Sequence, residues 1–458
     1  MAASITRRLT PIIEKAMATH NVPGAAVGIL QDGKEHHLAR GITSVEFPLD
    51  VDDRTLFQIG STTKTFTGTA LMMLVEEGKV DLDAPVSGYL PKFRLADANA
   101  LKELKVRHLV SHTGGFLGDY FDDLGRGADA IRRKVARMRK HTPQLTPVGA
   151  LWSYNNAGFY VLGQLIEELT GEAYENVIRD RIFGPLGMDM TFWFPEDVMT
   201  HKAALGHVLK VDGSLAIARP WGLTRGANPA GGICSTTVDQ IRYARFHLDG
   251  GRTADGKRLM KAATVRRMQK PLAHIGWSLA DDVGVTWLLD KIGSTAVVKH
   301  GGTVNGHMSE FLMVPSRGFA VTVLTNGQRG HEVGGAVLKW CLAELLGLKK
   351  PEPATRSLSA KAAAAYTGRY PTGAGDYVVT AENGGLLVSF EAKKELLEAD
   401  PEIAAQLPPP LPIAFVGKDR AVVEGPLMNG GRVEFFRDDT GAVEWMRFGG
   451  RINKRTPA

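Results

Sequence analysis

Residues 60–78 constrain the fold of this chain more than any other stretch. They begin Gly60-Ser61-Thr62-Thr63-Lys64 and continue without a charged side chain as far as Glu76, ahead of Gly78. The run is apolar on almost every side of a helix, and a helix of that kind is stable inside a protein rather than on its surface. The stretch therefore predicts a buried helix with the rest of the chain packed around it.

Ser61 and Lys64 lie three residues apart at the start of that helix, so they share one face and are close enough to touch. A serine hydroxyl becomes a strong nucleophile when a neighbouring base takes its proton, and a lysine with a lowered pKa is such a base. The helix start also offers backbone N–H groups and a positive dipole end to a developing oxyanion. On this spacing alone, a helix start with a solvated lysine is the competing interpretation.

Length and composition indicate an ordinary globular protein. The 458 residues predict about two or three domains, and 44% hydrophobic with 23% charged residues supply enough core material. The formal net charge of +6 is clustered only at residues 132–141, which we interpret as the solvated face of a surface helix. A lid whose cations attract acidic substrates is the alternative. We expect no nucleic-acid partner.

Cysteine content and the N-terminus bear on location. Cys234 and Cys341 are too few for a disulfide framework, and their apolar surroundings predict buried thiols. The N-terminus lacks the apolar core of a signal peptide, and no apolar run approaches the ~20 residues of a membrane span. These features predict a cytoplasmic protein with no membrane span.

Strand-like patterns occur at both ends of the first ~346 residues, with helices between them. Strands are expected at 24–30 and 34–40, joined as a hairpin, and at 295–300, 308–315 and 319–326; helices are expected at 4–20, 157–170 and 331–346. We expect one mostly antiparallel sheet built from both ends. The terminal helices should cover one face and the mainly helical middle the other.

The pattern changes after residue 348. Residues 349–360 are polar and contain prolines, as linkers often do. From 361 to 458 short alternating runs follow one another, separated by turn pairs such as Thr440-Gly441, which predicts a small all-β antiparallel barrel or sandwich. The expected domains are thus 1–348 and 361–458.

Tyr154-Asn155-Asn156 is a second candidate element of a catalytic site. It precedes a predicted helix, so its backbone should be extended, and Tyr154 and Asn156 should then face one cleft. A phenol near a lysine can shuttle protons to and from a serine, and an amide can hold both the lysine and a substrate amide. The alternative is a helix cap beside a packed tyrosine.

His300-Gly301-Gly302-Thr303 is the third candidate element. An edge strand that ends in small residues lets a substrate backbone approach closely, and an N–H there could pair with that of Ser61 to bind an oxyanion. A structural histidine at a strand end is the alternative.

Together these motifs resemble those of the penicillin-recognising serine hydrolases, the superfamily of class C β-lactamases and D-alanyl-D-alanine carboxypeptidases. The chain is most similar to the CubicO-like branch, which includes D-stereospecific aminopeptidases and β-lactamase-like esterases. Supporting stretches are Thr55–Gly60, Gly78–Asp83, Val106–Gly115, Gly184–Met188, Pro229–Gly232 and Asn305-Gly306. The resemblance covers about residues 5–346 and implies a β-lactamase/transpeptidase-like α/β fold. The segment around Tyr366–Tyr370 resembles the start of a lipocalin-like barrel.

By this resemblance Ser61 is the acylated nucleophile, and Lys64 and Tyr154 share the general-base and general-acid roles. Asn156, His300, Gly302 and Thr303 bind substrate, and the N–H groups of Ser61 and Thr303 form the oxyanion hole. Lysine-first forms of the third motif help hold a substrate carboxylate. The third motif here begins with His300 instead, and this form is similar to that of the D-aminopeptidase and esterase branches.

The predicted function is hydrolysis of amide bonds in small peptides, including peptides with D-residues, through an acyl-enzyme on Ser61. Ester hydrolysis and a non-hydrolytic acyl-binding protein are the alternatives. We expect no cofactor and no metal, since His331-Glu332 lacks a second histidine four residues after the first. The expected partners are a small molecule or short peptide and other copies of the chain in a homo-oligomer.

Overall fold

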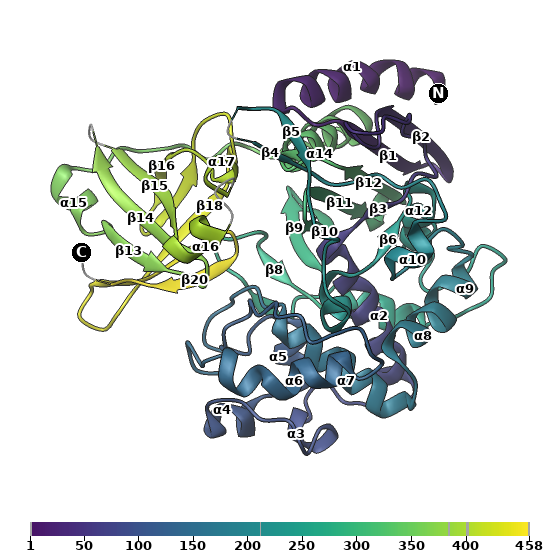
Figure 1. Cartoon of the computed structure of the whole chain (residues 1–458), viewed down its shortest axis with the longest axis horizontal. Helices are drawn as coiled ribbons and strands as arrows, with labels where there is room; N and C mark the ends of the chain where they lie inside the picture. The colour runs from purple at the N-terminus through teal and green to yellow at the C-terminus, as the bar shows by residue number, and fades with distance from the viewer. Residues whose placement is uncertain (1, 211, 383–384, 400–402, 457–458) are drawn as a thin grey trace.

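The computed structural model describes residues 2–210, 212–382, 385–399 and 403–456. Figure 1 shows two parts side by side, a larger one of helices around a sheet and a smaller one made mostly of strands. Each part is built on an eight-stranded sheet, and the two sheets share no strand.

The first sheet is antiparallel and is assembled from both ends of the larger part, as the sequence predicts. The hairpin of β1 and β2 pairs through β1 with β12, which places Ala25 opposite Thr325. The strands run in the order β2 (Lys34–Gly41), β1 (Gly24–Gln31), β12 (Phe319–Thr325), β11 (His307–Val314), β10 (Thr295–Val304), β9 (Leu288–Ile292), β8 (Asp282–Val283) and β7 (Ala273–His274).

Two terminal helices cover one face of this sheet. Helix α1 (Ala2–His20) packs beside α14 (Gly330–Trp340), and both bury apolar side chains against β1, β11 and β12. Helix α14 continues as a π-helical turn, Cys341–Leu345. The apolar side chains of α1 and α14 thus form one core with the sheet, as the predicted helices 4–20 and 331–346 require.

The opposite face carries the mainly helical region, with α2 (Thr63–Glu76) at its centre. The residues of α2 from Thr63 to Leu74 are all buried, which confirms the predicted interior helix. The helices around it are α3 (Val86–Tyr89), α4 (Ala98–Glu103), α5 (Val106–Val110), α6 (Ala130–His141), α7 (Ala157–Thr170), α8 (Tyr174–Ile178), α9 (Gly184–Leu186), α10 (Pro195–Val198), α11 (Asn228–Gly231), α12 (Thr237–Leu248) and α13 (Ala262–Met268).

Shorter elements connect these helices. The 3-10 turn η1 (Gly60–Thr62) leads directly into α2. The others are η2 (Arg179–Phe183), η3 (Arg225–Ala227), η4 (Pro315–Arg317) and the two-stranded pairs β3 (Phe57–Gln58) with β6 (Cys234–Ser235) and β4 (His207–Leu209) with β5 (Leu215–Ile217). The β3–β6 pair places the segment just before Ser61 beside residues 233–235.

The second part is a nearly closed antiparallel barrel. Each strand from β13 to β20 pairs with the next, and a bridge between Arg369 and Thr456 joins the first edge to the last. The strands are β13 (Gly368–Pro371), β14 (Gly375–Glu382), β15 (Gly385–Ala392), β16 (Leu411–Gly417), β17 (Arg420–Val423), β18 (Arg432–Arg437), β19 (Val443–Phe448) and β20 (Arg451–Lys454), with short helices α15 (Ala360–Ala364), α16 (Lys394–Ala399) and α17 (Ile403–Gln406). The predicted small barrel is confirmed.

The basic stretch lies on α6. Its arginines 132, 133, 137 and 139 are exposed, which fits the predicted surface helix, but Lys134 is fully buried. Cys234 and Cys341 are both buried and unpaired, as expected. Within the described residues, no helix combines the length and the apolar character needed to cross a membrane.

Candidate active site

Ser61 and Lys64 lie together at the start of the buried helix. The Nζ of Lys64 is 2.9 Å from the Oγ of Ser61 and donates a 2.6 Å hydrogen bond to the Ala230 carbonyl oxygen. Ser61 belongs to η1 and Lys64 to the first turn of α2, so the contact follows from local helical geometry. The predicted contact is thus present in the structure.

The surroundings of Lys64 favour its neutral form. Its side chain is fully buried, and Nζ lies 5.0 Å from the ring centre of Tyr154 and 5.3 Å from that of Phe159. Burial, and then the positive charge of Arg451, lower the pKa of Lys64 well below its ordinary value, while Asp119 opposes the shift. A neutral lysine amine next to a serine hydroxyl is equipped to accept its proton.

A buried ion pair supports the loop that binds Lys64. Glu175 accepts two 3.1 Å hydrogen bonds from Arg225 and one of 2.8 Å from the Asn228 amide. Asn228 begins α11, whose Ala230 carbonyl accepts from Lys64. The loop is therefore fixed at a point where a small shift would move the amine.

The edge of β10 passes directly beside Ser61. Strand β9 pairs with β10 only as far as Lys299, which leaves 300–304 unpaired on that side. A Cβ at Gly302 would lie 2.0 Å from the Ile59 carbonyl oxygen and 2.8 Å from the Ser61 nitrogen, so only glycine allows this approach. Gly60 has φ +51, and a Cβ there would be 2.8 Å from the Thr303 nitrogen. The backbone nitrogens of Ser61 and Thr303 therefore both lie at this contact.

We expect Gly302→Ala to reduce kcat/KM by roughly 10²-fold or more, because the new methyl group separates β10 from η1 and disrupts the oxyanion site. The matched control is Gly301→Ala, whose Cβ would lie 3.2 Å from its nearest neighbours, Glu310 and Ser309. Steady-state kinetics of both variants with any substrate of the wild type provides the comparison. Equal losses in the two variants would contradict the account.

Tyr154 presents a buried and neutral phenol to the same site. Its ring stacks on His112 with centres 4.5 Å apart, and its hydroxyl is buried beside the Ser61 hydroxyl. Burial raises the pKa of Tyr154, although the Ser61 hydroxyl and Arg451 oppose the shift. The charge distribution therefore favours Lys64 over a Tyr154 phenolate as the proton acceptor.

The two histidines of the site are also neutral. Burial, and then the charge that Lys64 carries when it is protonated, lower the pKa of His300 to about 3 and that of His112 well below its ordinary value. His300 Nδ1 lies 2.7 Å from the Gly301 carbonyl oxygen and therefore carries the proton, which makes the buried Nε2 an acceptor. His300 therefore has no positive charge to offer a substrate carboxylate at neutral pH.

Asn156 faces a carboxylate in the structure. Its amide donates a 2.8 Å hydrogen bond to Asp119, whose other oxygen accepts one of 2.6 Å from Arg451 Nε. Burial alone would raise the pKa of Asp119, but Arg451 outweighs it and holds that pKa below the ordinary value. The sequence analysis instead expected Asn156 to hold Lys64, whose hydrogen bonds go to Ser61 and Ala230.

Arg451 is the functional residue that the sequence analysis missed. It begins β20 of the barrel, and its guanidinium carbon lies 5.0 Å from the centre of the Tyr154 ring. The Tyr154 N–H donates a 2.8 Å hydrogen bond to the carbonyl of Gly450 in the same turn. The barrel thus forms one wall of the site.

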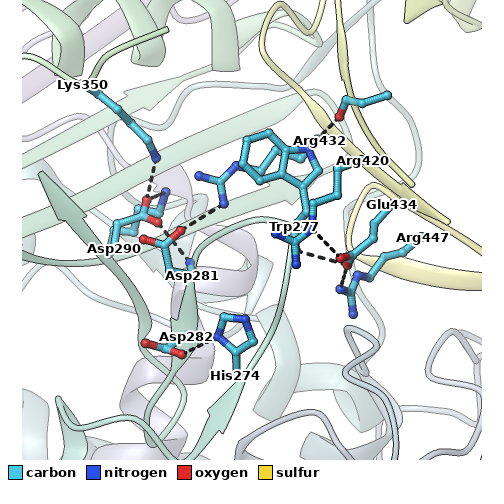
Figure 2. A network of polar contacts seen from close by, with 12 residues as sticks. His274, Trp277, Asp281, Asp282, Asp290, Lys350, Arg420, Arg432, Glu434 and Arg447 are labelled. Atoms are coloured by element: carbon cyan, nitrogen blue, oxygen red, sulfur yellow. Dashed lines mark hydrogen bonds and ion pairs between the residues drawn. The ribbon is translucent and has the colours of Figure 1, made fainter. Parts of the chain in front are cut away.

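A polar network holds the barrel against the first sheet (Figure 2). Glu434 accepts from the Trp277 backbone and forms an almost fully buried ion pair with Arg447. Arg447 also donates a 2.9 Å hydrogen bond to the Trp152 carbonyl, two residues before Tyr154. Arg432 stacks on Trp277 and pairs with Asp281 at 3.3 Å. These contacts hold the barrel strands that lead to Arg451 against residues 152, 277 and 281.

Among the described residues, no group of three or more His, Cys, Asp or Glu side chains is arranged to hold a metal ion. The arrangement is suited to acyl transfer, because a serine hydroxyl lies beside a buried lysine amine, with two backbone nitrogens and a neutral phenol close by.

The amino-acid sequence matches a known protein family. The family model described as Beta-lactamase matches residues 9–340. The chain belongs to the beta-lactamase family. Its homologues include penicillin-binding protein 4 of Amycolatopsis lactamdurans, 34% identical over 337 residues, which are 73% of this chain and 88% of that protein.

Similarity to solved structures extends over the barrel. The crystal structure of SurE aligns with a TM-score of 0.75 and 25% identity over 99% of both chains. The octameric penicillin-binding protein homologue of Pyrococcus abyssi aligns with a TM-score of 0.64 and 23% identity over 97% of this chain and 99% of that one. The protein is therefore a serine hydrolase of the beta-lactamase family, with a barrel following the catalytic fold.

Proposed function

We propose that the protein hydrolyses amide bonds of small peptides, including peptides with D-residues, through an acyl-enzyme on Ser61. The observation that carries this proposal is the 2.9 Å contact between Ser61 Oγ and a buried Lys64 whose pKa is lowered. In the first step the Ser61 oxygen bonds to the substrate carbonyl carbon while Lys64 takes the hydroxyl proton. The C–N bond then breaks, the amine leaves with a proton from the Lys64–Tyr154 pair, and water hydrolyses the ester on Ser61 to release the acid and restore the hydroxyl.

The N–H groups of Ser61 and Thr303 are proposed to bind the oxyanion, and Asn156 and His300 to contact the substrate. Gly302 supports this geometry through its approach to the Ser61 nitrogen. The unpaired edge at 300–304 supports an extended substrate, because free strand edges bind peptide backbones.

The neutral Tyr154 phenol favours amide over ester substrates. An amine is a poor leaving group until it is protonated, and a buried phenol beside Ser61 is a suitable proton donor. The neutral His300 removes the cation with which lysine-first family members hold a carboxylate. One SurE structure that aligns with this chain is described as SurE with D-Leu, which supports D-residues as candidate substrate components.

We expect Arg451→Met to shift the acid limb of the kcat/KM profile to higher pH. Arg451 lowers the pKa of Lys64 whereas Asp119 raises it, so losing the arginine raises the pKa of Lys64 and leaves less neutral amine on the acid side of the profile. Activity should fall there, by roughly tenfold for each unit by which the pKa rises, and recover at higher pH. Asp119→Asn should move the limb the other way.

The control for Arg451→Met is Lys454→Met on the same strand, since Lys454 is exposed and pairs with Glu444. Both pH profiles are measured with one substrate under identical buffers. A uniform loss at all pH values in Arg451→Met would show that the arginine acts only through folding.

The proposed function is tested by the initial rates of hydrolysis of a D-amino-acid p-nitroanilide and a short p-nitrophenyl ester, each corrected by the Ser61→Ala rate. Ser61-dependent anilide cleavage supports an amidase or peptidase. Ester cleavage alone would favour the carboxylic-ester hydrolase. Stoichiometric acylation of Ser61 without turnover would favour the non-hydrolytic acyl-binding protein.

A further prediction concerns the assembly of the chain. The homo-oligomer is supported by the octameric description of the Pyrococcus abyssi homologue and is tested by light scattering of the purified protein.

A further inference from the structure

Three hydrogen-bonded side chains link strand β10 to helix α14. The Oγ1 of Thr303 lies 2.9 Å from Nε2 of His331, and Nδ1 of His331 lies 2.6 Å from a carboxylate oxygen of Glu310. Thr303 belongs to β10, Glu310 to β11 and His331 to the first turn of α14. None of the roles proposed above uses His331 or Glu310.

The first of these three residues is Thr303, whose backbone N–H is proposed to bind the oxyanion. Thr303 is exposed, and it lies on the segment of β10 that β9 leaves unpaired. Its backbone nitrogen lies at the Gly60 contact beside Ser61. Its hydroxyl is therefore on the free edge of β10, where an extended substrate would lie.

The Thr303 hydroxyl has two hydrogen-bonding states, which depend on whether His331 is protonated. When His331 is protonated, both ring nitrogens donate, so the Thr303 oxygen accepts and its own proton must point away from the ring. When His331 is neutral, its remaining proton stays on Nδ1, where it is hydrogen-bonded to Glu310. Nε2 then becomes an acceptor for the Thr303 hydroxyl proton. One proton on His331 therefore redirects the hydroxyl.

We propose that His331 is a positioning residue that acts as a proton switch on Thr303. Its imidazolium form leaves the Thr303 hydroxyl free to donate to an acyl group bound beside Ser61, and its neutral form withdraws that donor. The inference rests on the proposed function, because it assumes acyl transfer at Ser61.

The charges around His331 favour its protonated form. The His331 side chain is 43% exposed, and the desolvation that would lower its pKa is outweighed by the hydrogen bond and charge of Glu310, and then by the charge of Glu332, which raise the pKa. The neighbouring strand β12 has no titratable side chain. The imidazolium therefore persists above the ordinary histidine range and is lost as the pH rises through the raised pKa.

The remaining charged groups near α14 are placed differently. Glu332 accepts a 2.9 Å hydrogen bond from the Met428 backbone of the barrel. Arg329 immediately precedes the helix and its side chain forms no capping hydrogen bond, and on α1 the guanidinium of Arg8 stacks on Trp340 at the other end. Glu310 is thus the one of these groups that forms a hydrogen bond with the His331 ring.

The titration itself is measured by NMR of the His331 ring on the full chain, with the signal assigned by its loss in His331→Gln. We expect a pKa above 6.5 that falls in Glu310→Gln. A value below 6.5 in the wild type, or no change in Glu310→Gln, would overturn the proposal.

The effect on Ser61 is measured as the rate of phosphonylation by an alkyl fluorophosphonate between pH 6 and 10. The serine oxygen bonds to phosphorus, fluoride leaves, and the phosphoryl oxygen occupies the oxyanion site. The wild-type rate should drop about two- to tenfold, the contribution of one hydrogen bond, at the pH of the His331 titration. That step should be absent in His331→Gln and in Thr303→Val, which keeps the backbone N–H.

The matched control is His274→Gln, since His274 pairs with Asp282 at 2.9 Å and contacts neither Ser61 nor Thr303. The step should persist in this variant. If the step persists in His331→Gln or Thr303→Val, the switch is wrong while Ser61 remains the nucleophile. If the probe labels Ser61→Ala as fast as the wild type, the proposed function itself fails.

Discussion

Ser61→Ala is expected to lose turnover of every substrate, by roughly 10⁴-fold or more, because no other group takes over the acylated oxygen. Its melting temperature should be close to that of the wild type, since the Ser61 hydroxyl interacts only locally, with the Lys64 amine and the Tyr154 phenol. Hydrolysis rates and thermal unfolding of the two proteins provide the comparison.

The contrasting control is Ser111→Ala. The Ser111 hydroxyl is buried, donates a 2.7 Å hydrogen bond to the Arg107 carbonyl and lies 2.9 Å from Thr113. Its loss should reduce the free energy of unfolding by about 1 kcal/mol and leave turnover in place. Retained activity in Ser61→Ala would reject the nucleophile assignment, whatever the control shows.

Lys64→Met is expected to reduce kcat/KM by about 10²- to 10⁴-fold, the usual contribution of a general base. Stability should be kept or increased at neutral pH. The pKa of Lys64 is lowered in the folded state, so the unfolded chain binds more protons at neutral pH and stability rises with pH toward the ordinary lysine pKa. Methionine removes that proton-linked cost and fills the same apolar space.

The matched control is Lys134→Met. Lys134 is also fully buried, burial lowers its pKa to about 8, and its ammonium lies near the rings of Tyr120 and Tyr160. Its hydrogen bond goes to the Asp122 carbonyl rather than to a nucleophile. Turnover should survive in this variant, and equal losses of activity in the two variants would show that Lys64 acts through packing rather than as a base.

The predictable parts of this protein are those governed by local pattern. The buried helix and the Ser61–Lys64 contact follow from side-chain spacing, and the antiparallel sheet from strand patterns at both ends of the larger part. The same helical spacing also predicts the burial of Lys134. It lies on the helix face of Ile131, Val135 and Met138, which are buried, so its burial could have been predicted despite the surrounding charges.

The unpredicted parts depend on tertiary contacts between distant segments. Arg451 meets Asp119 across 332 positions of sequence, and nothing in its local pattern separates it from other arginines of the barrel. The Ala230 carbonyl is a backbone group and carries no sequence signal. His331 entered the sequence analysis only as a failed metal motif, because its partners Thr303 and Glu310 belong to other elements.

The most direct test of the acyl-enzyme is mass spectrometry of protein quenched during turnover of a D-amino-acid p-nitroanilide. Trypsin releases Ser61 in the peptide Thr55–Lys64, because Arg54 precedes it and Lys64 ends it. The account predicts that this peptide gains the mass of the acyl group in the wild type and not in Ser61→Ala. Anilide hydrolysis at the full rate with the acyl group on another peptide, or on none, would contradict it.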